Sequence, residues 1–363
     1  MNPLTRRDVV AHQAAMPWPS QRQVEQDLLL CQAMTALFND KFLRTQIAMR
    51  GGTLLHKVHL APAARYSEDI DLVVFGDRPE NHIAKAIRRV LRDVLGKPTD
   101  SVWDTIQLAI RNVVRPSRVL RLTYSVPAVS EPGANLDIVV EANVTERTPH
   151  RAIVQIPFEF TFRETAVKSV LNGYDLHELL GTKMRALFQR KRGRDLFDLY
   201  WALTVANPAV EPAAVVESFQ HYLRQEGGGA GRAEFVGILD SHLADRGFCT
   251  DMDHLLRMGV SYDPQKAGEH VKARLLGLLP ESPRSRRPRP AIGRGRRDSP
   301  AANGRAYECG LSNVWLNVLS SARMAPFCHA RQGVARYASE PSLPAAFPLA
   351  RRNRVSSLGG LWS

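Results

Sequence analysis

The stretch that decides the fold is RGGTLLHKVHLAPAARYSEDIDLVVF, residues 50–75. A short apolar segment, TQIAM, predicts a strand before the glycine pair, and DIDLVVF predicts a second strand after a helical turn. Alternate side chains of a strand share a face, so Asp69 and Asp71 should point together while Ile70 enters the core. The apolar LVVF segment that follows indicates that this strand is buried and central.

The two aspartates require a cation, because neighbouring carboxylates repel each other and resist ionisation. Magnesium prefers oxygen ligands, and metal ions shared between carboxylates assist attack at phosphorus. Each element alone is also typical of an ordinary strand or turn, but their conjunction favours Mg²⁺-dependent nucleotide transfer. The phosphate donors expected beside the aspartates are the backbone of Gly51 and Gly52 and the side chains of Thr53, Arg65 and Ser67.

A third carboxylate is expected on a neighbouring strand. The segment LDIVVEANVTER offers Asp137 and Glu141, which are four residues apart and therefore share a strand face. Both residues also fit an ordinary strand, and spacing alone leaves the choice between them open.

Charged residues crowd a second segment, YDLHELLGTKMRALFQRKRGRDLFDLYWAL. It predicts two helices joined at Gly193. Lys183 would lie on a partly apolar face of the first helix, and Asp195 and Asp198 would share a face of the second. A solvated helix pair with weak ion pairs is one interpretation; the second half of a catalytic site is the other.

The remaining periodicity predicts an α+β fold: a mixed β-sheet domain with flanking helices plus a C-terminal helical domain. One helix should begin after Ser20, with Gln23 as its capping-box partner, and another should cover about residues 80–95. The strand-like segments are TIQLAIRNVV, RVLRLTYSV, NLDIVVEANV and IVQIPFEFTF, and the pattern is helical from Asp175 to about Leu279. The expected divisions are residues 1–172, residues 173–280 and a tail at residues 281–363.

The tail differs in composition from the rest of the chain. It holds 14 arginines, no lysine and four acids, and so carries most of the net charge of +13. Its Arg/Pro/Gly/Ser-rich start predicts a segment that does not pack. The tail is either a recent extension or frameshifted end of the chain, or a nucleic-acid-binding arm. The sequence has no long apolar run and no secretory signal, which favours a cytoplasmic protein without a membrane span.

The segments RGGTLLHKV and RYSEDIDLVVF resemble sequence motifs of the DNA polymerase β-like nucleotidyltransferase superfamily, and within it those of the AbiEii/AbiGii toxin family. The spacing E-x4-K-x2-A-L-x2-R-x3-R-D-x2-D, which begins at Glu178, is similar to a signature of that family. The family pattern also has a glutamate followed two residues later by asparagine, as Glu141 and Asn143 are here. Two residues before that glutamate, where the family often has lysine, this chain has Val139. The resemblance covers about residues 20–280.

The resemblance implies an active site and a biological role. Asp69, Asp71 and Glu141 would hold the metal, Lys183 would contact the triphosphate, and Asp195 or Asp198 would orient Lys183, Arg194 or the sugar. The protein would be the toxin of a toxin–antitoxin pair that transfers nucleotides from a nucleoside triphosphate to RNA, for example the 3′ end of tRNA. Transfer to a protein hydroxyl and an inactive nucleotide-binding relic are the alternatives. The basic residues that would meet an RNA backbone, unless they are only a solvated surface, are Arg111, Arg115, Arg118, Arg121 and those from Arg185 to Arg194.

Overall fold

Strand β2 (Asp69–Val74) lies in the middle of a seven-stranded mixed sheet in the computed structural model, which describes residues 4–110, 113–206, 208–225 and 231–281. The strand order is β3-β4-β5-β2-β1-β7-β6. Strand β2 runs antiparallel to β1 and parallel to β5, and β1 runs parallel to β7. The other strands are β1 (Ile47–Arg50), β3 (Asp100–Ile110), β4 (Val113–Pro127), β5 (Asn135–Asn143), β6 (Val154–Phe162) and β7 (Thr165–Gly173).

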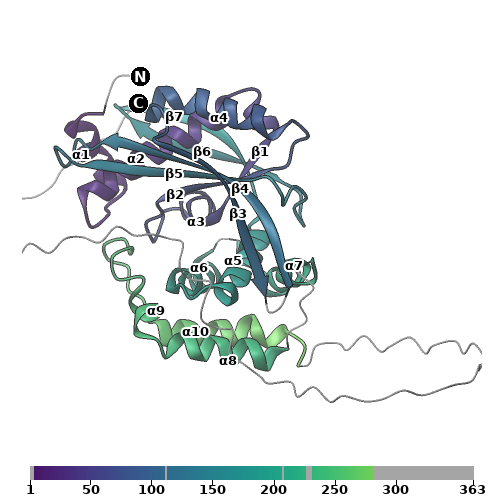
Figure 1. The fold of residues 1–363 in the computed structure, drawn as a ribbon. Helices are drawn as coiled ribbons and strands as arrows, with labels where there is room; N and C mark the ends of the chain where they lie inside the picture. Colours follow the sequence, from purple (N-terminus) through teal and green to yellow (C-terminus); the bar gives the residue numbers. More distant parts are fainter. Residues whose placement is uncertain (1–3, 111–112, 207, 226–230, 282–363) are drawn as a thin grey trace, which may run out of the picture. The chain divides into compact units, whose positions relative to one another are not determined.

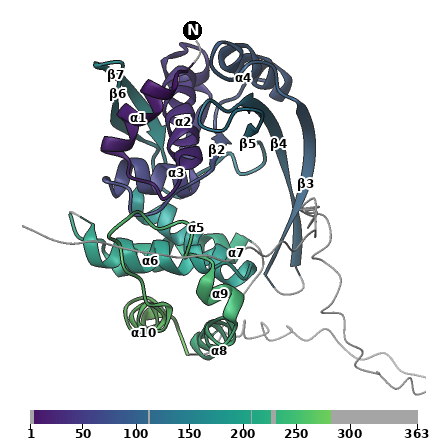
Figure 2. The same cartoon turned by 90° about the vertical axis from the view of Figure 1, so that its left-hand side faces the viewer.

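One face of the sheet is covered by helices that come early in the chain. Helices α2 and α4 pack there, with α1 against α2 (Figures 1 and 2). The predicted capping box at the start of α2 is confirmed, because Ser20 accepts from Gln23 N and Gln23 caps the Ser20 backbone in return. These helices are α1 (Arg6–Ala15), α2 (Gln21–Asn39) and α4 (Glu80–Leu95), with a short turn η1 (Leu43–Thr45) before β1.

The second group of helices lies on the other side of the sheet (Figures 1 and 2). Between β1 and β2 the chain forms one turn of α-helix and then one turn of π-helix, and this segment contacts α5. The bounds are α3 (Gly51–Leu54), η2 (Leu55–His59), α5 (Leu176–Gln189), α6 (Gly193–Val205), α7 (Pro212–Gln225), α8 (Arg232–Leu243), α9 (Arg246–Thr250), α10 (Pro264–Arg274) and η3 (Leu276–Leu278).

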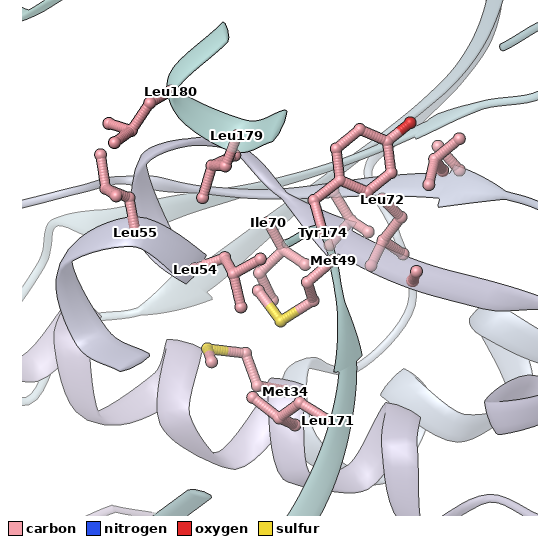
Figure 3. Packing of buried hydrophobic residues seen from close by; sticks show 14 of the residues in the cluster. Met34, Met49, Leu54, Leu55, Ile70, Leu72, Leu171, Tyr174, Leu179 and Leu180 are labelled. Atoms are coloured by element: carbon pink, nitrogen blue, oxygen red, sulfur yellow. The ribbon is translucent and has the colours of Figure 1, made fainter. Parts of the chain in front are cut away.

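A continuous apolar core joins the sheet to both helical groups. Figure 3 shows Met34 from α2 and Leu179 from α5 on opposite sides of Met49 and Ile70, and all four side chains are fully buried. Ile70 therefore faces the core, as the alternation of the DIDLVVF segment predicts, and leaves its two neighbours free to face the other way.

The predicted α+β class is confirmed, but two strand assignments were wrong. The segment TIQLAIRNVV is not one strand: β3 ends at Ile110 and β4 begins at Val113. Strand β7 was not predicted, because TAVKSVLNG lacks a clear alternation of apolar residues. The tail at residues 281–363 lies, after Glu281, outside the described residues. Among the helices of the described part, none is long and apolar enough to cross a membrane.

Candidate active site

Three carboxylates lie side by side on the two central strands. Asp69 and Asp71 are both partly exposed on one face of β2. Glu141 of β5 is the register partner of Asp71, and it is partly exposed as well. Asp137 is exposed and lies further along β5, beyond Val139, the register partner of Asp69. The sheet register therefore places Glu141, rather than Asp137, directly beside Asp71.

The ionisation of this group shows the cost of crowding. Burial, together with the charges of Asp71 and Glu141, raises the pKa of Asp69 to about 7. Burial and the charge of Asp71 also raise the pKa of Glu141, although Arg121 donates from Nε to Glu141 Oε1 at 2.8 Å and opposes the rise. Carboxylates that resist ionisation in this way are stabilised by a bound cation. Oxygen donors of this kind fit a divalent metal such as Mg²⁺.

The double-glycine turn lies directly against these carboxylates. Gly51 has a φ of +79°, and a Cβ built on it would lie 1.8 Å from Asp71 Oδ2. A Cβ on Gly52 would lie 2.6 Å from the Arg65 Nη2 and 3.0 Å from the Ser67 hydroxyl. Only glycine fits this approach of backbone to side chains.

The hydroxyls of Thr53 and Ser67, which were predicted to bind phosphate, make hydrogen bonds within the protein. Thr53 is fully buried, its hydroxyl donates to the Asp69 carbonyl, and it lies 2.9 Å from Ser67 Oγ. These contacts fix the start of β2 against the glycine turn. A direct contact of either hydroxyl with a nucleotide stays a prediction.

Asp198 lies at the centre of a buried ion cluster. The Arg65 guanidinium donates to both of its oxygens, from Nε at 2.6 Å and from Nη2 at 2.8 Å. Lys183 Nζ lies 2.8 Å from Asp198 Oδ2, and His56 Nε2 lies 2.8 Å from Asp198 Oδ1. Burial alone would raise the pKa of Asp198, but Arg65 and Lys183 hold it well below its usual value. Asp198 is therefore ionised and surrounded by donors.

Asp195 extends the same cluster by one turn of α6. Arg190 donates to both of its oxygens, at 2.8 and 2.9 Å, and Lys183 Nζ lies 3.4 Å away. Two carboxylates thus hold three cations, Arg65, Lys183 and Arg190, which leaves an excess of one positive charge. The charge of Asp71 contributes to the raised pKa of Arg190, so this cation lies within electrostatic range of the sheet carboxylates. The helix pair is not the solvated surface that was the alternative interpretation.

The structure adds His56 to the predicted set and gives Arg190, a residue of the quoted signature, its partner. His56 contacts Asp198, which belongs to a distant element, and Arg190 pairs with Asp195 across the junction of α5 and α6. The only signal for His56 in the sequence was its proximity to Gly51. Arg194 donates its backbone N–H to Asp251 at 3.0 Å and is paired with neither Asp195 nor Asp198 among the described residues, although its charge opposes the rise in the pKa of Asp69.

A second group of possible metal ligands lies away from this site. His12, Asp27 and Cys31 bring ligand atoms within 4.8 Å of one another in the described part of the chain. The Lys57 ammonium donates to Asp27 and lies 3.7 Å from Cys31 Sγ. Although burial raises the pKa of Asp27, Lys57 and His12 lower it to about 2. A cation of the protein already neutralises this carboxylate, so the group fits a structural ion pair better than a metal site.

The basic residues of the β3–β4 region are largely paired. Arg118 Nη1 lies 2.9 Å from Glu80 and its guanidinium covers the Trp103 ring, while Arg121 pairs with Glu141. Arg111 lies outside the described residues, and the Arg115 side chain does too. At the α5–α6 junction, Arg190, Lys191 and Arg192 are exposed, although Arg190 pairs with Asp195 and Lys191 Nζ lies 2.6 Å from Asp245.

Comparison with known proteins places these residues in a family. The model of the family described as "Nucleotidyl transferase AbiEii toxin, Type IV TA system" matches residues 32–275, which is more than half of the chain. No curated protein matches. Among solved structures, MenT4, a nucleotidyltransferase toxin from Mycobacterium tuberculosis H37Rv, is similar with a TM-score of 0.47 and 17% identity, over 76% of this chain and 91% of that one. The matched range contains every site residue described above, and the chain belongs to the AbiEii family of nucleotidyltransferase toxins of type IV toxin–antitoxin systems.

Proposed function

We propose that this nucleotidyltransferase toxin transfers a nucleoside monophosphate from a nucleoside triphosphate to an RNA hydroxyl, at the 3′ end of tRNA, with Mg²⁺ and release of pyrophosphate. One observation carries the proposal: the carboxylates of Asp69, Asp71 and Glu141 adjoin on neighbouring strands, and Asp71 lies directly against Gly51. This arrangement provides metal ligands and a phosphate-binding backbone at one place. Because the substrates of this reaction are cytoplasmic, the toxin would act there.

Asp69, Asp71 and Glu141 are the proposed metal ligands. Nucleotidyltransferases generally use divalent metals. When bound, magnesium would neutralise charge on the triphosphate and on the attacking and departing oxygens. The raised pKa of Asp69 and of Glu141 supports this role, because their repulsion is relieved by a cation.

Lys183 is the proposed triphosphate contact of the helical region. It is held by Asp195 and Asp198, and its side chain is 7% exposed, so its ammonium is positioned before substrate arrives. The excess positive charge of the cluster favours a polyphosphate over a neutral ligand. The proposed role of Asp195 and Asp198 is to orient the side chains of Arg190, Lys183 and Arg65. The proposed nucleotide-binding surface comprises Gly51, Gly52, Thr53, Arg65, Ser67 and Lys183.

Arg65 takes an indirect part in this proposal. Its guanidinium is 2% exposed, donates to both oxygens of Asp198 and lies beneath Gly52. It would therefore support the glycine turn and fix Asp198, and its charge would act on the phosphates through the turn.

An exposed basic junction supports RNA over protein as the acceptor. Arg190, Lys191 and Arg192 follow one another between α5 and α6, and Arg190 is also part of the cluster that faces the carboxylates. Such a row of cations beside the reaction site fits a phosphate backbone. Nucleotidylation of a protein hydroxyl uses the same metal chemistry and remains the second candidate.

The experiment incubates the purified chain with Mg²⁺, each labelled nucleoside triphosphate in turn, and total tRNA. An Asp69→Ala/Asp71→Ala variant, shown by circular dichroism to be folded, serves as the control. Label transferred to RNA by the wild type alone supports the proposal. Label transferred to protein would show that the acceptor is a protein hydroxyl and not RNA. Binding of nucleotide without any transfer would identify an inactive relic.

A further inference from the structure

The π-helical turn η2 (Leu55–His59) connects the glycine turn to two helices and to the segment between β7 and α5. Its His56 contacts Asp198 of α6, its Lys57 donates to Asp27 of α2, and His59 Nε2 lies 2.9 Å from the Tyr174 carbonyl. π-helical turns are rare in proteins, and those that occur are often found at functional sites. Of these three contacts, only that of His56 reaches the ion cluster around Asp198.

His56 is a neutral donor inside the ion cluster. It is fully buried and stacks on the Phe197 ring, with centroids 5.9 Å apart. Burial lowers the pKa of His56 to about 4, so its imidazole is uncharged near neutral pH. The ionised Asp198 requires a donor, which places the imidazole hydrogen on Nε2. Nδ1 has no hydrogen-bond partner among the described residues.

The contact between His56 and Asp198 gives each oxygen of Asp198 two donors. Oδ1 receives His56 and Arg65 Nε, while Oδ2 receives Arg65 Nη2 and Lys183. Without His56, Oδ1 would keep a single donor, and the carboxylate would be held by Arg65 and Lys183 alone. Because His56 is neutral, it supplies this restraint without adding charge to the cluster.

We propose that His56 is a positioning residue for Lys183, acting through Asp198, and that it couples the glycine turn to the triphosphate-binding ammonium. The proposal rests on the proposed role of Lys183 at the triphosphate. The path runs along the backbone from Gly51 to His56 and then through two contacts, from His56 to Asp198 and from Asp198 to Lys183, so that it joins the two halves of the site.

The test compares His56→Leu, which removes the donor at similar volume, with His56→Gln, whose amide nitrogen can occupy the place of Nε2. Affinity for a non-hydrolysable nucleoside triphosphate analogue is measured by calorimetry with Mg²⁺, beside KM, kcat and thermal unfolding. His56→Leu should weaken binding and raise KM about tenfold, because a hydrogen bond to a charged group is lost. His56→Gln should recover most of that loss.

Two further variants make the outcome decisive. His59→Leu removes a contact of the same turn that does not reach Asp198, so its binding should equal the wild type even if its unfolding temperature falls. Lys183→Met tests the underlying function separately. If Lys183→Met binds the analogue as the wild type does, the proposed function fails. If Lys183→Met loses binding while His56→Leu retains it, or if His56→Gln binds no better than His56→Leu, the positioning role of His56 is overturned.

Discussion

The Asp71 carboxylate fills the space that a side chain at Gly51 would need: a Cβ on Gly51 would lie 1.8 Å from Asp71 Oδ2. The contact follows from the sheet, since Arg50 at the end of β1 is the register partner of Asp71 in β2. The chain leaves β1 with a φ of +79° at Gly51 and turns back across the carboxylate. The glycine thus allows the backbone to approach the carboxylate closely, at the place proposed for the substrate phosphates.

Gly51→Ala should reduce activity by roughly 10²-fold, because displacement of a catalytic group by about 1 Å has costs of that order. The matched control is Gly96→Ala. Gly96 has a similar φ of +83° but nothing within 4 Å of a built Cβ. Both variants should lose roughly 1–2 kcal/mol of unfolding free energy through backbone strain, and only Gly51→Ala should lose transfer activity. Equal activities of the two would show that contact with Asp71 is immaterial.

The sequence predicts the parts of the fold that have local causes. The capping box of Ser20 and Gln23 sets the start of α2, and the alternation around Ile70 sets β2. Strand β7 escaped prediction because its place comes from pairing with β1 and β6, which its own residues do not encode by periodicity. The division between β3 and β4 was not predicted because apolar residues lie on both sides of it.

The same distinction applies to the site. Asp69 and Asp71 were identifiable because one strand presents both. The link between Arg65 and Asp198 joins residues 133 positions apart and depends on how α6 packs near the glycine turn. His56 lay within the quoted stretch, yet its contact with Asp198 could not be predicted without the position of α6. The resemblance to a family supplied Lys183, Asp195 and Asp198 as a set, and the structure assigns their contacts.

Glu141→Gln should reduce transfer by roughly 10²-fold or more, since metal ligands contribute several kcal/mol to transition-state stabilisation. Asp137→Asn is the control on the same strand. Asp137 is exposed and Glu141 is the register partner of Asp71, so Asp137→Asn should leave kcat within about twofold. Steady-state transfer assays over a range of Mg²⁺ concentrations measure both. A larger loss in Asp137→Asn would make Asp137 the third acid.

Asp69→Asn should stabilise the metal-free protein while abolishing transfer. The Asp69 pKa of about 7 lies above the ordinary 3.8, so the folded protein binds an extra proton between these values and loses stability as pH rises through them. Because the asparagine cannot ionise, the unfolding free energy of the variant should exceed that of the wild type by roughly 1–3 kcal/mol at pH 8. At pH 4 the two unfolding free energies should differ little.

The measurement is urea unfolding in EDTA across this pH range. Adding Mg²⁺ should narrow the difference at pH 8, because metal binding stabilises the wild type by mass action. An Asp69→Asn variant that is less stable than wild type at pH 8 in EDTA would show that the carboxylates do not repel each other in the folded protein.

Lys183→Met and Asp198→Asn should separate catalysis from folding. In Lys183→Met, Asp195 keeps the Arg190 guanidinium and Asp198 keeps that of Arg65, so the fold should persist while transfer is lost. In Asp198→Asn, Arg65 and Lys183 lose their shared buried counter-charge, and unfolding free energy should fall by about 3–5 kcal/mol. Thermal unfolding followed by circular dichroism, with transfer assayed on the same samples, measures both effects. Equal destabilisation by the two substitutions would mean that Lys183, rather than Arg65, is the main partner of Asp198.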